Sequence, residues 1–163
     1  TPNDAIIIAS GTTVLAFARC IPPEAQLTVL TSAMNVAMAL LNCQQVEVIQ
    51  LGGIVRHTSS SVTGEYALRM LENFSGTKLF LGVDGIDLKY GLTTTNFMEA
   101  SVNRAMIDAA QKIIVLTDSS KFGRRGFGKI CELDAVDQII TDSGVSPKVV
   151  RELEELGIKV SIV

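Results

Sequence analysis

The sequence predicts an α/β domain built on an open, mostly parallel sheet with helices on both faces. Short apolar runs alternate with helix-like segments along all 163 residues, a pattern typical of parallel strands joined by right-handed crossovers. The chain is 47% hydrophobic and only 19% charged, which excludes a disordered polypeptide. A chain of this length fits one core better than two. We therefore expect residues 1–163 to form a single domain.

The expected strands are short and rich in apolar, β-branched residues. They cover residues 5–9, 27–31, 46–51, 79–83, 113–116, 138–141 and 159–163. Four expected helices carry apolar residues at helical spacing, over 14–20, 33–41, 64–74 and 97–110. A last helix is expected between Ser146 and Gly157. Ser146 as N-cap, Pro147 in the first turn and Gly157 after the last turn are in the usual order for a helix. Residues 54–61 and the glycine-rich basic segment 121–129 lack such periodicity and are expected to be loops.

Polar residues follow the first expected strand directly, as Ser10-Gly11-Thr12-Thr13. Backbone N–H groups and the positive end of a helix dipole converge at such a turn, which favours a phosphate or a carboxylate. The alternative is that Ser10 or Thr12 simply caps the helix. The turn matches neither the P-loop nor the G-x-G-x-x-G pattern, so it does not imply a nucleotide.

The stretch from Leu79 to Ala100 is the most informative one. A buried strand runs into Asp84, which lies between Gly82 and Gly85, and Asp87 follows. Hydroxyl and amide side chains come next, and they are hydrogen-bonding groups only; they are Thr93, Thr94, Thr95 and Asn96, followed by Glu99. The alternatives are that the aspartates cap turns and that Asn96 and Glu99 form a capping box.

Three further strand ends carry residues of the same kinds. Thr31 and Ser32 close the second strand, Gly52-Gly53 and then Arg56 follow the third, and Lys121 follows the fifth. Taken singly, each is ordinary turn chemistry or a solvated cation. The carboxyl ends of parallel strands lie at one edge of the sheet, where ligands bind. Five such ends therefore favour one small-molecule site.

Composition also argues against several classes of function. A net charge of −3 and the lack of tryptophan make this domain a poor candidate for direct contact with nucleic acid. The three cysteines show no C-x-x-C pattern and His57 has no metal-ligand spacing around it, so we expect no metal and a reducing, cytoplasmic location. No apolar run approaches the ~18 residues of a membrane span. The chain has no initiator methionine, and we expect it to be part of a longer protein.

Six short motifs occur in an order that resembles the C-terminal effector-sensing domain of the DeoR family of bacterial sugar-metabolism regulators. They are Ser10-Gly11-Thr12-Thr13, Leu51-Gly52-Gly53 with Arg56, Phe80–Asp87, Gly91-Leu92-Thr93-Thr94, Asp118–Gly123 and Ile140–Gly144. The resemblance covers essentially the whole chain. It implies a fold related to ribose-5-phosphate isomerase and the CoA transferases, a phosphorylated sugar as effector and no cofactor. It also implies a homo-oligomeric repressor whose upstream helix-turn-helix domain, absent from this chain, binds operator DNA.

The resemblance also implies residue roles. Ser10, Gly11, Thr12 and Thr13 would hold the phosphate, Asp84, Gly85, Thr94 and Glu99 would line the sugar, and Lys121 would reach the anion. The predicted contacts from the strand ends are Thr31, Ser32, Gly53, Arg56 and Asn96. Ala9 is a departure, because the family often has aspartate there, and no polar contact is expected from it.

The alternative function is a sugar-phosphate isomerase, since Asp84, Asp87 and Glu99 resemble the acidic residues of those enzymes. Their chemistry also needs a positive group that stabilises an enediolate. The isomerases carry a lysine in a glycine-rich segment that corresponds to residues 91–96 here, where no lysine occurs. We therefore favour a sensor over an enzyme. The working hypothesis is that the effector orders residues 56–61 and 121–129 and so shifts the oligomer between two states of different DNA competence.

Overall fold

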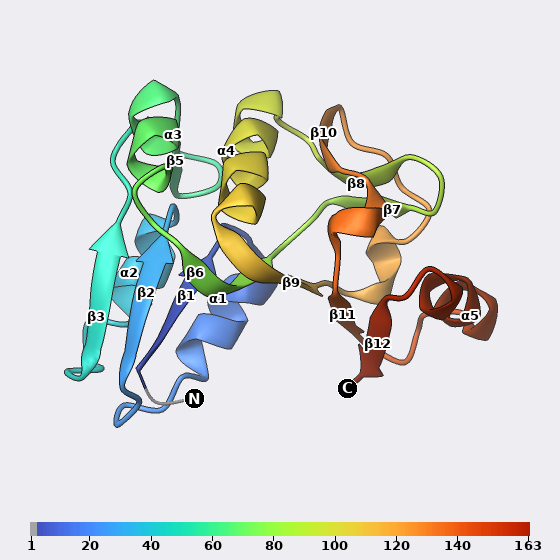
Figure 1. Ribbon diagram of the computed structural model, residues 1–163, viewed down its shortest axis with the longest axis horizontal. Helices are drawn as coiled ribbons and strands as arrows, with labels where there is room; N and C mark the ends of the chain where they lie inside the picture. The colour runs from blue at the N-terminus through green and yellow to red at the C-terminus, as the bar shows by residue number, and fades with distance from the viewer. Residues whose placement is uncertain (1–2) are drawn as a thin grey trace.

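The computed structural model describes residues 3–163 and contains a seven-stranded sheet in the order β3-β2-β1-β6-β9-β11-β12 (Figure 1). Every neighbouring pair in this sheet is parallel. The strands are β1 (Asp4–Ile8), β2 (Leu27–Thr31), β3 (Val46–Gln50), β6 (Gly76–Leu81), β9 (Ala110–Leu116), β11 (Gln138–Thr141) and β12 (Lys159–Ile162). The predicted parallel sheet is confirmed.

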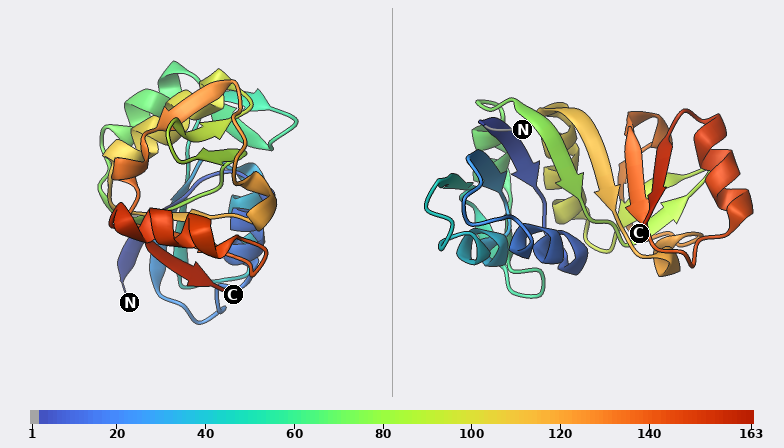
Figure 2. Two further views of the ribbon diagram at one scale, coloured as in Figure 1. Left: turned by 90° about the vertical axis from the view of Figure 1, so that its right-hand side faces the viewer. Right: turned by 90° about the horizontal axis from the view of Figure 1, so that it is seen from below.

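Helices cover both faces of this sheet. They are α1 (Thr12–Arg19), α2 (Met34–Ala39), α3 (Glu65–Leu71), α4 (Phe97–Asp108) and α5 (Pro147–Glu155). Figure 2 shows α1 and α2 on one face and α3 and α4 on the other. Successive side chains of a strand point to opposite faces, so Ile8 packs in a core with α1 and α2, whereas Ile7 packs in a second core with α3 and α4.

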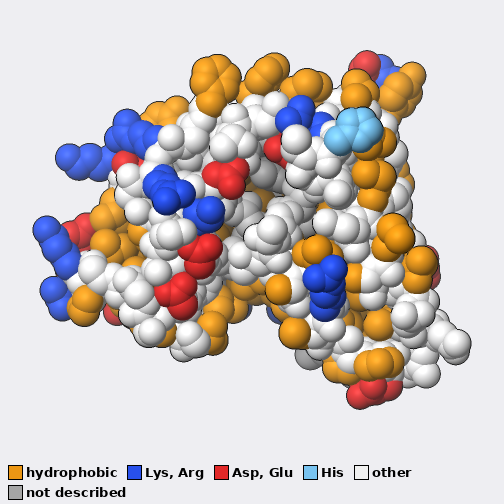
Figure 3. All heavy atoms as spheres, turned by 180° about the vertical axis from the view of Figure 1, so that it is seen from behind, with side chains coloured by type: hydrophobic (Ala, Val, Ile, Leu, Met, Phe, Trp, Pro, Cys, Tyr) orange, Lys and Arg blue, Asp and Glu red, His pale blue; other side chains and the backbone are white. Residues whose placement is uncertain are grey.

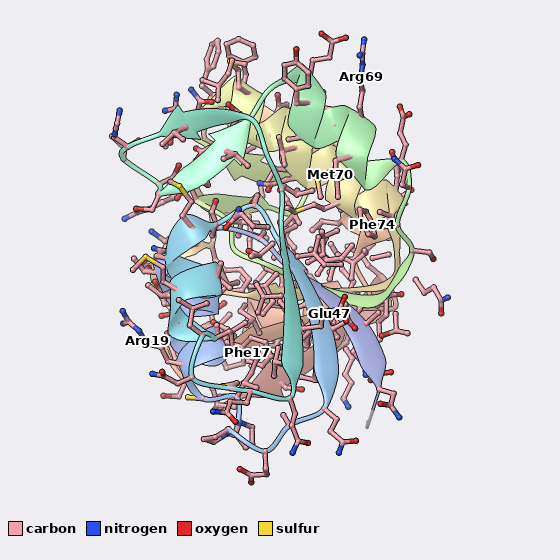
Figure 4. The ribbon with its side chains drawn as sticks, turned by 90° about the vertical axis from the view of Figure 1, so that its left-hand side faces the viewer. Phe17, Arg19, Glu47, Arg69, Met70 and Phe74 are labelled. Atoms are coloured by element: carbon pink, nitrogen blue, oxygen red, sulfur yellow. The ribbon has the colours of Figure 1, made fainter. Side chains whose placement is uncertain are left out.

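The labelled side chains in Figure 4 illustrate the two cores. Phe17 points from α1 toward the sheet and stacks on Phe80 with ring centroids 4.3 Å apart. Met70 and Phe74 pack against the core on the α3 side. Arg19, at the end of α1, points into solvent.

The segment 54–61 was expected to be a loop, and that expectation is wrong. It contains β4 (Ile54–Arg56) and leads into β5 (Ser61–Thr63), and the two pair antiparallel as a hairpin. Each strand has only three residues, too few for a periodicity to show in the sequence. The hairpin is held by long-range contacts, because Met34 N–H donates to Ser60 O (2.7 Å) and Val62 N–H donates to Ser32 O (3.0 Å).

A small antiparallel sheet also lies at the carboxyl end of β6. It comprises β10 (Gly128–Cys131), β8 (Gly91–Thr94) and β7 (Gly85–Asp87), in that order. In the sequence these segments show polar residues and a basic loop without strand periodicity, so these three strands were not predicted. Thr93 and Thr94 are buried in this sheet, and hydroxyls are buried readily where hydrogen-bond partners are at hand.

Two 3₁₀ turns complete the described elements, η1 (Ser119–Lys121) and η2 (Leu133–Ala135). None of the helices in residues 3–163 is both long enough and apolar enough to cross a membrane.

Candidate functional site

The predicted site residues follow neighbouring strands and therefore lie in a row along the carboxyl edge of the large sheet. Backbone hydrogen bonds continue past the strand ends, from Ala9 N–H to Phe80 O (3.0 Å) and from Leu51 N–H to Thr31 O (2.9 Å). In sheet order, the row runs from the turn after β3, past those after β2 and β1, to those after β6 and β9. This face of the molecule is hollowed, and acidic and basic side chains lie around the hollow (Figure 3).

None of the hydroxyl groups in the turn after β1 caps the helix that follows. Gly11 is the N-cap of α1, with φ of 135°, and the cap makes no side-chain hydrogen bond. The alternative in which Ser10 or Thr12 caps the helix is therefore wrong. Thr12 and Thr13 are exposed in the first turn of the helix, close to its free N–H groups and to the positive end of its dipole.

The loop after β6 approaches this turn closely. A β-carbon at Gly82 would come within 3.2 Å of Ser10 O and within 4.0 Å of Gly11 Cα. Glycine permits this approach because it has no side chain. The polar turn after β1 and the loop that carries Asp84 are thus direct neighbours.

Asp84 ties the end of β6 to the end of β8. Its Oδ2 accepts hydrogen bonds from Thr94 Oγ1 (2.7 Å) and from Thr95 N–H (3.0 Å). Its own N–H donates to Thr93 O (2.9 Å). Gly85, the next residue, begins β7 and pairs with Thr93. Asp84 therefore joins two elements at the edge instead of capping a local turn, and its carboxylate is partly exposed there.

Glu99 and Arg56 meet at the other side of the row. Asn96 caps α4 through Oδ1, which accepts from Met98 N–H (3.0 Å) and Glu99 N–H (3.1 Å). The Glu99 side chain turns away from the cap, because its Oε1 accepts from Ser61 Oγ (3.4 Å) and lies 3.9 Å from Arg56 Nε. The reciprocal half of the capping box is thus replaced by contacts with the β4–β5 hairpin.

The Arg56–Glu99 pair is incompletely satisfied. Arg56 Nε is buried and has no hydrogen-bond partner, although its side chain is 31% exposed overall. Buried N–H groups normally have partners, and a guanidinium binds phosphate and carboxylate with several donors at once. The pair therefore keeps donor capacity for a bound anion or hydroxyl.

The other predicted residues at the strand ends are buried, bonded within the fold or placed beside a neighbouring strand. Thr31 is fully buried, and its Oγ1 accepts from Ala33 N–H (3.0 Å). Ser32 is also buried, and Gly53 lies immediately before β4. Lys121 ends η1 and is partly exposed; the following residue, Phe122, forms a bridge with Ile86 of β7. Lys121 is thereby placed beside the strand that starts at Gly85.

Asp87, considered with Asp84 at the sequence level, belongs to a different environment. Its carboxylate accepts from Lys89 N–H and Tyr90 N–H and pairs with Arg125 (3.0 Å). The hydrogen bond from Arg125 and the two backbone N–H groups lower the pKa of Asp87 to about 2. Asp87 thus ends β7 and its carboxylate caps the turn that follows. Conversely, Ser61 was not predicted as a site residue, although the serine run at 59–61 was a signal that pointed to it.

The described cavities do not coincide with this row. A cavity of about 280 Å³ lies between α3 and α4, and one of about 270 Å³ lies between β7 and α5; neither is lined by a predicted site residue. Within residues 3–163, no three His, Cys, Asp or Glu side chains are grouped so as to hold a metal ion. The candidate site is an open, polar depression at the sheet edge.

The parallel sheet with helices on both faces is an α/β fold similar to that of ribose 5-phosphate isomerase A. The chain aligns with ribose 5-phosphate isomerase A from Neisseria gonorrhoeae with a TM-score of 0.54 at 14% identity, covering 77% of this chain and 48% of that one. It also aligns with eIF2B beta from Chaetomium thermophilum with a TM-score of 0.54, covering 85% and 43% of the two chains. At such identities the likeness shows the fold alone.

Sequence relatives then identify the family. Residues 1–143 match the DeoR C terminal sensor domain, and this chain belongs to that family of sensor domains, as its motifs predicted. It is 41% identical over 162 residues to a protein of Escherichia coli O157:H7 named as a transcriptional repressor of the aga operon. It is 38% identical to the HTH-type transcriptional regulator YulB of Bacillus subtilis.

These alignments cover 99% of this chain but only 60% and 62% of the relatives' lengths. The chain thus spans about three fifths of the regulators that it matches. Both relatives are named as regulators and not as enzymes, so the sensor interpretation prevails over the isomerase alternative.

Proposed function

We propose that this chain senses the effector of a bacterial, cytoplasmic transcriptional regulator and that the effector is a phosphorylated sugar. The observation that carries the proposal is the row itself. An uncapped helix N-terminus after β1, the Asp84 carboxylate after β6 and the half-satisfied Arg56–Glu99 pair lie along one sheet edge. Anion-binding groups beside carboxylate and hydroxyl groups suit a ligand with one phosphate and several hydroxyls.

In this proposal the phosphate binds at the Ser10–Thr13 turn, and Lys121 approaches it from the loop after β9. Asp84 and Glu99 accept hydrogen bonds from sugar hydroxyls, and Arg56 donates one. Thr94 and Asn96 hold these carboxylates in place, Thr94 through its bond to Asp84 (2.7 Å) and Asn96 through the α4 cap. The roles proposed for Asp84, Thr94 and Asn96 thus match the bonds that these residues already make.

Effector binding would act on the contact between the β4–β5 hairpin and α4. Arg56 lies on the β4–β5 hairpin, whereas Glu99 lies on α4. A ligand that inserts between them changes the position of the hairpin relative to the helix. A ligand can bias two states only through different affinity for them, and this pair offers such a difference. The hairpin, already folded, would move as a unit rather than become ordered.

The remaining partners of the whole regulator are operator DNA, bound through an upstream helix-turn-helix domain, and further copies of this chain. Exposed aromatic side chains support self-association. Tyr66, Phe97 and Phe127 are 74%, 61% and 83% exposed, and hydrophobic side chains gather along the top of Figure 3, the margin where Figure 1 places α3, α4 and β10. Aromatic residues are enriched at protein–protein interfaces. Light scattering of the purified chain would measure the oligomer.

A thermal-shift panel tests the effector. Pentose and hexose phosphates are compared with the same sugars without phosphate and with inorganic phosphate. A true effector at 100 times its Kd stabilises the folded chain by about 2.7 kcal/mol, and only phosphorylated sugars should do so. If no phosphorylated sugar raises the melting temperature, or if the unphosphorylated sugars raise it equally, the proposal is wrong.

A matched pair of variants localises the binding. Arg56→Gln should abolish most of the thermal shift, because it removes the guanidinium at the site. Arg19→Gln removes the same charge from the exposed end of α1 (Figure 4) and should leave the shift unchanged. Equal losses in both variants would indicate a non-specific effect of net charge.

A further inference from the structure

The motif Thr141–Gly144 begins at the last residue of β11 and takes no part in the proposed ligand contacts. β11 pairs with β9 in the large sheet, and Thr117 N–H, just past β9, donates to Ile140 O (3.1 Å). The loop after β11 is therefore the next member of the row along the carboxyl edge. Its neighbour is the loop that contains η1 and Lys121.

Asp142 joins these two loops. Its Oδ2 accepts from Ser119 N–H (2.9 Å), and its Oδ1 accepts from Gly144 N–H (2.8 Å). A β-carbon at Gly144 would clash with Ser119 Oγ, so the two loops pack directly against each other. One carboxylate thus spans from the end of β11 to the first residue of η1.

Further bonds anchor η1 at its first residues and just past its last one. Asp118 caps the turn by accepting from Ser120 N–H (2.9 Å) and from the Ser120 hydroxyl. Gly123 N–H donates to Ile86 O (2.7 Å). Lys121 is therefore the partly exposed end of a three-residue turn whose backbone is fixed on both sides.

We propose that Asp142 is a positioning residue of the effector site, which sets the direction of Lys121 by holding the amide of Ser119. The inference rests on the proposed function, because it takes Lys121 as a phosphate contact. In this role Asp142 makes no direct contact with the ligand. Both of its oxygens are engaged by backbone N–H groups, and these hydrogen bonds together with the Ser119 hydroxyl lower the pKa of its carboxyl, so it stays ionised in that role.

For Asp142→Asn, a positioning role and simple charge repulsion predict opposite changes in the affinity for a phosphorylated sugar. Asp142→Asn keeps the size of the side chain, but its amide group can no longer accept from both N–H groups. If Asp142 positions Lys121, affinity for a phosphorylated sugar falls about tenfold, the loss of one well-aligned charged hydrogen bond. If Asp142 were only a negative charge near an anion, its removal would raise affinity.

Two control variants separate these accounts. Asp137 lies just before β11, at its opposite end, and accepts from Ile113 N–H (2.7 Å). Asp137→Asn therefore removes the charge of a carboxylate that also binds a backbone N–H, but away from the edge, and should leave affinity unchanged. Asp118 lies close enough to Lys121 for that ammonium to help lower the Asp118 pKa. Asp118→Asn can still cap η1, and it should raise affinity about two- to fivefold by removing a competitor for Lys121.

The experiment is calorimetric titration of the unmodified chain and the three variants with the sugar phosphate that gives the largest thermal shift, and with its unphosphorylated sugar. Amide hydrogen exchange at residues 119–121 is measured in parallel. The expected result is a loss confined to the phosphorylated ligand in Asp142→Asn, with faster exchange in this turn and not in Asp137→Asn.

Equal or higher affinity in Asp142→Asn, or unchanged exchange at residues 119–121, would overturn the positioning role while leaving the proposed function intact. Failure of the unmodified chain to bind any sugar phosphate would instead refute the proposed function, and the positioning role with it.

Discussion

The two edges of the large parallel sheet carry polar groups of similar kinds that are arranged differently. At the amino edge, Lys78 pairs with Asp4 (3.2 Å) and Thr77 Oγ1 donates to Ala5 O (3.1 Å). These bonds join the adjacent strands β1 and β6, whose register pairs Ile6 with Lys78. They fasten one strand to its neighbour.

At the carboxyl edge, the bonds join loops that belong to different layers. Arg56 on the hairpin faces Glu99 on α4, and Asp84 after β6 reaches Thr94 on β8. One donor, Arg56 Nε, stays without a hydrogen-bond partner. The comparison shows that polar residues in a sheet protein divide by position. Those at the amino edge complete the sheet, whereas those at the carboxyl edge connect separate elements and leave the Arg56 Nε donor unpaired.

The largest expected effect is a loss of stability from a substitution in the core between the two edges. Leu81 is fully buried at the end of β6, directly before the loop that carries Asp84. Leu81→Ala should lower the free energy of unfolding by about 2–5 kcal/mol, because it leaves a cavity in the core. Urea denaturation followed by circular dichroism measures this loss. A loss below about 1 kcal/mol would show that the end of β6 is loosely packed.

The next largest effect is expected at the carboxyl edge, on ligand affinity and not on the stability of the fold. Glu99→Gln should weaken binding of a phosphorylated sugar about ten- to a hundredfold, since it removes a charged acceptor from the site. Its effect on stability should be small, because the contact to Arg56 is long (3.9 Å) and Arg56 is partly exposed. Calorimetric titration and urea denaturation of the same preparation test both halves. Lower stability with unchanged affinity would show that Glu99 supports the fold and does not bind the ligand.

At the amino edge we expect the reverse, a small loss of stability without a change in ligand affinity. Lys78→Met removes an ion pair whose side chains are 34% and 15% exposed, and such pairs contribute at most about 1 kcal/mol. Stability should fall by no more than that, and the affinity for sugar phosphate should not change. A change in affinity would contradict the division between the two edges.

The smallest effect concerns Asp87, a carboxylate near the site that belongs to a turn. Its pKa is about 2 in the folded chain against an ordinary 3.8, so the unfolded chain binds this proton first as pH falls. The contribution of Asp87 to stability is therefore complete above about pH 4 and is lost as the pH falls toward 2. Asp87→Asn should flatten the stability profile between pH 4 and 2, as measured by urea denaturation. An unchanged slope would mean that Arg125 and Asp87 do not pair in solution.

Most of the large sheet was predictable because its strands are strongly apolar. The predictions for 27–31 and 138–141 coincide with β2 and β11, and the other large-sheet strands differ only at their ends. Helix α5 was predictable from its boundaries, since Ser146 accepts from Val149 N–H and Pro147 opens the helix, as expected. Strong local signals of this kind act within a few residues and need no tertiary context.

The small sheets were not predictable for the opposite reason. Thr93 and Thr94 look like surface residues in sequence, yet they are buried because β8 lies between β7 and β10. Strand β10 pairs with β8 although more than thirty residues separate Thr94 from Gly128. No local pattern encodes a pairing over such a distance, and three- or four-residue strands are stable only within the folded whole.

The sequence by itself determined the alternation of strands and helices, the family to which the chain belongs and the polar character of five strand ends. Apolar periodicity and short motifs are local properties that any chain displays without folding. Only the tertiary structure decided that Asp84 binds Thr94, that Glu99 leaves its helix cap for Arg56, and that Asp87 belongs to a turn. Those outcomes depend on which loops meet at the sheet edge, because a hydrogen bond forms only between groups that the fold brings within about 3 Å.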